Sequence, residues 1–136
     1  MILKQYKDSY RYNSDTIFLY NFIVKHRLHG SLLDVGSGCG ILGLLLKRDF
    51  PDIELTQIEV QNKYAKLSLE NAKINGIKSL LIENDFLTYA FVNRYDTIVS
   101  NPPFYHSGSL KSENSSLLLS RHSDSLVFDK FAKKAY

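Results

Sequence analysis

The sequence has no tryptophan, one methionine and one cysteine, Cys39, among its 136 residues. A single cysteine cannot form an internal disulfide, which suits a reducing compartment, so we expect a cytoplasmic protein. The four histidines and the cysteine lack metal-ligand spacing, which argues against a structural zinc site. No apolar run reaches the roughly 18 residues of a membrane-spanning helix, and no signal-peptide core follows Met1. These absences predict a protein without a metal, a membrane anchor or an export signal.

The composition that remains, 44% hydrophobic and 23% charged, is that of an ordinary globular domain, and the length allows one domain over residues 1–136. Apolar periodicity and turn residues predict alternating helices and strands. The expected strands are 31–36, 53–59, 79–83 and 96–100, and the expected helices are 14–29, 41–48, 61–75 and 125–136. Strands that alternate with helices indicate a Rossmann-like, doubly wound parallel sheet with right-handed crossovers.

Sheets of this kind bind ligands beyond the carboxyl ends of their strands. The first of these ends carries Gly36, Gly38 and Gly40 just after Asp34. Glycine lets the backbone bend tightly and lets a ligand approach it closely. The same loop also fits a dinucleotide fingerprint, but Asp34 would repel a pyrophosphate there. A ligand with an ammonium group would be attracted instead, which favours an amino-acid-bearing cofactor over NAD.

The second and third strand ends carry carboxylates. Glu59 can accept hydrogen bonds from both hydroxyls of a ribose. Asp85 can accept one from an exocyclic amine, with Phe86 beside the base. Each acid alone is more often an exposed strand-end charge, but three acids in phase with three successive strands favour a binding site.

The fourth strand runs into Asn101, Pro102, Pro103 and Phe104. A proline offers a carbonyl without an N–H, so the Pro102 carbonyl and the Asn101 side-chain oxygen can act as two acceptors aimed at one point. The matching ligand is a planar –NH2 group. Two good hydrogen bonds to it favour a more pyramidal, more nucleophilic nitrogen in the transition state. Phe104 offers an apolar face on which a flipped-out base can stack.

These four strand ends together resemble those of the class I S-adenosylmethionine-dependent methyltransferases, and the segment from Asn101 to Phe104 is similar to their amino-group methylation motif. The resemblance covers about residues 31–104. The resemblance implies the fold of that enzyme class, with S-adenosylmethionine as the cofactor. It also implies that the four residues of the motif hold a target amine in line with the methyl group. The residues that would hold the cofactor are Asp34, Gly36, Gly38, Gly40, Glu59, Asp85 and Phe86.

A narrower resemblance lies outside that core. Residues 10–19 are similar to the segment before the first strand in bacterial enzymes that N6-methylate the adenine beside the anticodon of a valine tRNA, and the residues after Phe104 resemble that family too. Asn13 and Thr16 stand where that family has glycines. The resemblance implies a tRNA partner, and places Asp15 at the cofactor entrance.

The family's sheet has seven strands in the order 3-2-1-4-5-7-6, whereas this sequence supplies about four. Residues 96–100 would then form an exposed apolar edge, which invites pairing. We therefore expect a truncated or split methyltransferase domain, with a second chain as a candidate source of the missing strands. Two further substrates stay open, the glutamine of a peptide release factor and a guanine N2 of ribosomal RNA. A non-catalytic fragment that keeps the cofactor residues is the alternative from a different functional class.

Overall fold

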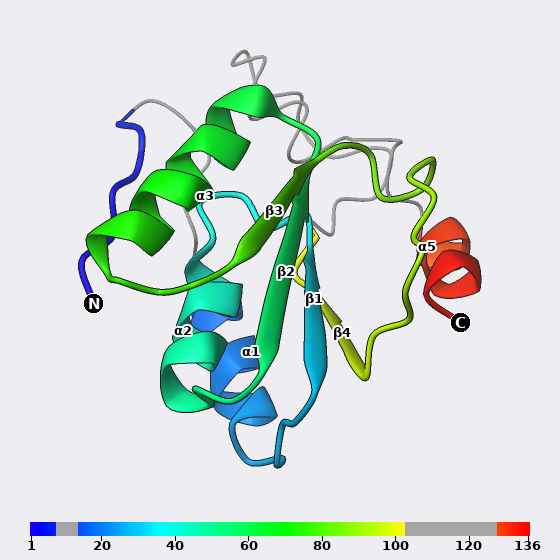
Figure 1. Cartoon of the computed structure of the whole chain (residues 1–136), viewed down its shortest axis with the longest axis horizontal. Helices are drawn as coiled ribbons and strands as arrows, with labels where there is room; N and C mark the ends of the chain where they lie inside the picture. The colour runs from blue at the N-terminus through cyan, green and yellow to red at the C-terminus, as the bar shows by residue number, and fades with distance from the viewer. Residues whose placement is uncertain (8–13, 103–127) are drawn as a thin grey trace.

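The computed structural model describes residues 1–7, 14–102 and 128–136 (Figure 1). The strands are β1 (Ser31–Val35), β2 (Glu54–Glu59), β3 (Leu80–Glu83) and β4 (Thr97–Ser100). The helices are α1 (Ser14–Ile23), α2 (Ile41–Asp49), α3 (Asn62–Ile74) and α5 (Phe128–Ala135). The start of the last expected helix lies outside the described residues, as do Pro103 and Phe104.

The four strands form one sheet in the order β3-β2-β1-β4, and every neighbouring pair is parallel. This confirms the predicted doubly wound parallel sheet and the order of the four strands. Val35 at the end of β1 pairs with Ile58 on one side and with Ser100 on the other. The carboxyl ends of the three strands therefore lie side by side at one edge of the sheet.

Two apolar layers enclose the sheet (Figure 1). Helices α1, α2 and α3 cover one face, where Leu32, Leu44 and Leu46 are at most 1% exposed. Residues 84–96 and α5 cover the other face, where Leu33 and Phe86 are buried. Each fully buried leucine contributes about 1.5–3 kcal/mol relative to an exposed one, so this core fixes the strand ends in place.

Helix α1 is shorter than the expected helix over residues 14–29. It ends at Ile23, and the next residues form turns in which His26 N–H donates to the Ile23 carbonyl at 2.9 Å. Gly30, at φ +67°, then lies against Asp96, whose carboxylate accepts the Ser31 N–H at 2.7 Å. Helix α1 thus ends before the expected boundary, and Asp96 separately holds the start of β1.

Within the described residues, no helix is long and apolar enough to cross a membrane, and no three His, Cys, Asp or Glu side chains gather where a metal could bind. In this sheet β4 pairs with β1 alone, so it is an edge strand.

Candidate functional site

The loop between β1 and α2 contains three glycines with positive φ: Gly36 at +66°, Gly38 at +56° and Gly40 at +85°. A Cβ at either of the first two would meet no atom within 4 Å. A Cβ at Gly40 would lie 2.5 Å from the Ser68 hydroxyl oxygen. All three positions require the left-handed backbone that glycine adopts most easily. Gly36 and Gly38 thus border open space, whereas Gly40 packs tightly against α3.

Asp34 lies beneath this loop and is 2% exposed. Its Oδ2 accepts the Gly43 N–H at 3.0 Å and lies 3.5 Å from Gln57 Nε2. Burial raises the pKa of this carboxyl to about 6, because removal from water disfavours the charged form. The closeness of Asp34 also explains why residue 43 is a glycine, since a Cβ there would lie 2.8 Å from Asp34 Oδ2. The described contacts of Asp34 are therefore with the start of α2, and its place near a bound ammonium stays a prediction.

Gln57 and Ser68 complete a buried polar cluster under the loop, and both are fully buried. Gln57 Nε2 donates to the Gly40 carbonyl at 3.3 Å, and the Ser68 hydroxyl donates to Gln57 Oε1 at 2.9 Å. A buried amide is costly unless its donor and acceptor are both satisfied. Both ends of this amide have partners, so the cluster holds the loop in one shape.

Glu59, the last residue of β2, faces the glycine loop and is 5% exposed. Its Oε2 accepts the Gly38 N–H at 2.9 Å, and its Oε1 accepts the Gln61 N–H at 2.8 Å. Burial raises the pKa of this carboxyl above its ordinary value. Each carboxylate oxygen keeps a second lone pair, so the two backbone bonds orient the group without using up its capacity to accept.

Asp85 and Phe86 follow β3. Asp85 is partly buried, and its Oδ1 accepts the Leu87 N–H at 2.9 Å, which holds the turn after the strand. Phe86 is 5% exposed, and its ring centroid lies 5.7 Å from that of Phe91 and 5.3 Å from that of Phe131. Phe86 is thus part of the core on the α5 face, and its contact with an adenine stays a prediction.

Asn101 and Pro102 follow β4 and are both partly buried. The Asn101 Nδ2 donates to the Thr16 hydroxyl oxygen at 2.8 Å, and Thr16 is 3% exposed on α1. Asp15, the neighbour of Thr16 in the first turn of α1, is exposed. The structure therefore brings the start of α1 next to the end of β4.

Residues 11–126 match the family model described as the methyltransferase small domain. The chain belongs to this methyltransferase family. It is 36% identical over 112 residues to the tRNA1(Val) (adenine(37)-N6)-methyltransferase of Aliivibrio fischeri (strain ATCC 700601 / ES114), covering 76% of this chain and 45% of that protein. It is 33% identical over 105 residues to the Bacteroides thetaiotaomicron enzyme of the same name, covering 75% of this chain and 44% of that one.

Another similar protein is the ribosomal RNA small subunit methyltransferase C of Haemophilus ducreyi, at 34% identity over 89 residues, 65% of this chain and 27% of that one. The chain spans less than half the length of these relatives.

Solved structures show the same fold. The Pyrococcus abyssi tRNA (uracil-54, C5)-methyltransferase, solved with S-adenosyl-L-homocysteine, superimposes with a TM-score of 0.59 at 19% identity over 71% of this chain and 24% of that chain. Coclaurine N-methyltransferase, also bound to S-adenosyl-L-homocysteine, gives a TM-score of 0.58 at 18% identity over 71% of this chain and 30% of that one. The methyltransferase small domain of this chain thus has the fold of S-adenosylmethionine-dependent methyltransferases.

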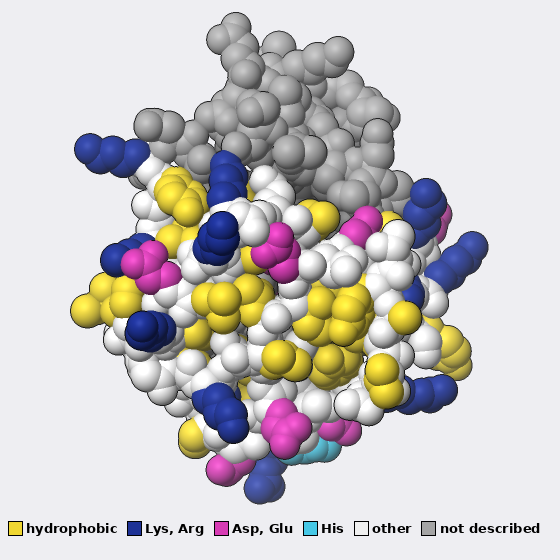
Figure 2. Space-filling view, turned by 45° about the horizontal axis from the view of Figure 1, so that its top comes forward, with side chains coloured by type: hydrophobic (Ala, Val, Ile, Leu, Met, Phe, Trp, Pro, Cys, Tyr) yellow, Lys and Arg dark blue, Asp and Glu magenta, His cyan; other side chains and the backbone are white. Residues whose placement is uncertain are grey.

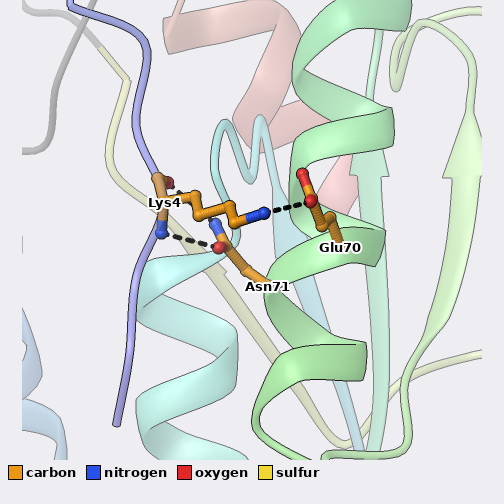
Figure 3. Close-up of polar contacts among 3 residues, drawn as sticks. All are labelled: Lys4, Glu70 and Asn71. Carbon is orange, nitrogen blue, oxygen red and sulfur yellow. Dashed lines mark hydrogen bonds and ion pairs between the residues drawn. The ribbon is translucent and has the colours of Figure 1, made fainter.

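The structure also adds a residue that sequence reasoning missed, Asn71 of α3. Asn71 is fully buried, accepts the Lys4 N–H at 2.8 Å and donates to the Lys4 carbonyl at 3.1 Å (Figure 3). It also donates to the Cys39 carbonyl in the glycine loop at 2.9 Å. Lys4 forms an exposed ion pair with Glu70 at 2.5 Å beside it. One asparagine therefore joins residues 1–7, which precede the matched domain, to the glycine loop.

Proposed function

We propose that this methyltransferase domain binds S-adenosylmethionine at the carboxyl edge of its sheet and directs the methyl group to the N6 amine of an adenine in tRNA. The fold and the family support the cofactor. The two similar tRNA1(Val) (adenine(37)-N6)-methyltransferases support the substrate. The observation that carries the proposal is that β4 and β1 end side by side: Ser100, the residue before Asn101, pairs with Val35, the residue before Gly36.

The residues present fit the proposed cofactor. Among the described residues, no side chain fills the space beside Gly36 and Gly38. Between them, the Ser37 hydroxyl oxygen is buried and has no hydrogen-bond partner within the described part of the chain. A buried hydroxyl of this kind suits a polar ligand group. Glu59 is oriented by two backbone N–H groups, and its remaining lone pairs would accept the hydroxyls of a ribose.

The chemistry asked of the chain is mainly orientation. The sulfonium of S-adenosylmethionine supplies an already activated methyl group. An exocyclic amine is a weak nucleophile because its lone pair is delocalised into the ring. The Asn101 oxygen and the Pro102 carbonyl would accept its two protons, which favours the pyramidal nitrogen of the transition state. This role needs acceptors in a fixed place, and it needs no strong base.

Cofactor binding is tested by calorimetry on the wild type and on two glutamate variants. Glu59→Ala removes two acceptor oxygens, so we expect S-adenosylmethionine affinity to fall about a hundredfold. Glu83→Ala is the matched control, because Glu83 is exposed, pairs with Glu59 in the sheet and bonds only to Asn62 in the described structure. A folded wild type that does not bind the cofactor, or an equal loss in both variants, would contradict the assigned site.

The substrate is tested by transfer of a labelled methyl group to tRNA that lacks the modification. On the face shown in Figure 2, Lys and Arg side chains are spread among apolar and acidic ones and form no single patch of described residues. The charges on this face therefore do not point to a docking site, and transfer itself must identify the substrate. Ribosomal RNA is the second candidate, supported by the Haemophilus ducreyi relative, and a glutamine-bearing release factor is the protein alternative. Cofactor binding without transfer to any of the three would favour the non-catalytic or partner-dependent reading.

A further inference from the structure

The carboxamide of Asn101 has one accepting end and one donating end. A half turn about its last torsion exchanges the two. An amine that must give up its protons needs the oxygen, Oδ1, to face it. The proposed methylation therefore depends on whatever fixes the orientation of this amide, as well as on the presence of Asn101.

We propose that Thr16 is the positioning residue that fixes this orientation, an inference that rests on the proposed amine methylation. Its hydroxyl oxygen accepts the Asn101 Nδ2 proton at 2.8 Å, across 85 residues of sequence. With Nδ2 turned toward α1, Oδ1 is the end left for the target amine. The reversed amide would point its donor at another donor, which is repulsive and blocks the acceptor role.

Thr16 is well placed to hold the amide still. It is 3% exposed, so water competes little for the Asn101 proton. Its β-branched side chain has few rotamers available in a helix. Its neighbour Ile17, together with Tyr20, packs against the apolar cluster that includes Leu45, which anchors this part of α1. The hydroxyl therefore has a defined position relative to β4.

The contact is tested first without turnover, by NMR of the ¹⁵N-labelled full chain. The side-chain NH2 signal of Asn101 is assigned from its loss in Asn101→Ala. In Thr16→Val, which removes the hydroxyl with little change of shape, we expect these protons to exchange with solvent about tenfold faster. Thr16→Ser should keep the wild-type rate, and so should Thr56→Val, the matched control at a buried threonine of β2 that is 7% exposed. An unchanged Asn101 exchange rate in Thr16→Val overturns the role of Thr16.

Kinetics then test the consequence. We expect Thr16→Val to lower kcat about tenfold while KM and S-adenosylmethionine affinity stay within about twofold, and Thr16→Ser to restore most of kcat. An equal loss of kcat in Thr56→Val, or no rescue by serine, would make Thr16 merely structural and overturn the inference. A wild type that binds cofactor but methylates no amine contradicts the proposed function instead, while the exchange measurement still decides the role of Thr16.

Discussion

Replacing Asp34 with asparagine should stabilise the fold at neutral pH and leave its stability at pH 4 nearly unchanged. Asparagine keeps the size of the side chain and an oxygen that can accept the Gly43 N–H. It also resembles the protonated carboxyl, which is the form that burial favours. The substitution therefore removes the cost of a buried charge and retains the packing.

The magnitude follows from the pKa of Asp34, which is raised from 3.8 to about 6. At 1.36 kcal/mol per pH unit, ionising this buried group costs the folded state about 3 kcal/mol, as an order of magnitude. Between these two pH values the folded chain holds a proton that the unfolded chain has lost. The contribution of Asp34 to the free energy of unfolding is therefore largest below about pH 4, falls as the pH rises to about 6, and stays lower above that. The raised pKa of Glu59 acts in the same direction.

Urea unfolding at several pH values between 4 and 7.5 measures this difference. We expect the gain in stability of Asp34→Asn over wild type to grow across that range and to reach up to about 3 kcal/mol at pH 7.5. Asp52→Asn, at an exposed position, is the matched control for the substitution itself. If Asp34→Asn instead destabilises the chain equally at both ends of the range, the native structure favours the Asp34 charge, and the argument from burial is wrong.

Three further outcomes follow from the glycine loop and α3. Gly40→Ala should lower the free energy of unfolding by about 2–4 kcal/mol, since the new Cβ would lie 2.5 Å from a hydroxyl oxygen and the backbone φ is unfavourable for alanine. Gly76→Ala has a similar φ of +63° but no described atom near the new Cβ, so it should lower the free energy of unfolding by only about 1–2 kcal/mol. Urea unfolding compares the two variants. Asn71→Leu should free residues 1–7, because it leaves the carbonyl of Lys4 unpaired, and faster hydrogen exchange and proteolysis there would show it. Glu70→Gln should change the free energy of unfolding by less than about 1 kcal/mol, because its ion pair is exposed.

The strand ends were predictable from the sequence because each strand stops at a chemically distinct residue. Period-two apolar patterns located the strands to within one or two residues, and parallel pairing then brought Glu59 and Asn101 to one edge. The end of α1 was not predictable in this way. The apolar pattern continues past Ile23, where the helix stops, and the start of β1 is held by Asp96, a residue far along the chain whose carboxylate accepts the Ser31 N–H.

The polar cluster under the loop escaped sequence reasoning for a different physical reason. Periodicity assigns apolar residues to the interior and polar ones to water. In α3 a helical apolar stripe would bury Leu69 together with Ala65 and Ala72, yet Leu69 is 49% exposed, whereas Ser68 and Asn71 are fully buried. Only the hydrogen-bond partners make these polar positions favourable inside, and those partners come from other elements of the fold.

Hydrogen-bond partners from other elements also explain why polar and apolar residues alternate along β2 although nearly all of the strand is buried. Its alternation separates two buried faces of different polarity. Thr56 and Ile58 face the side of the apolar cluster around Phe86, while Gln57 and Glu59 face the glycine loop. Burying this polar face lowers the stability of the fold, as the raised pKa of Glu59 shows. A ligand that hydrogen-bonds to this face binds only the folded state. It should therefore raise the free energy of unfolding by RT ln(1 + [L]/Kd), where [L] is the free ligand concentration. Binding of a cofactor to this polar face would therefore offset part of the cost of burying it.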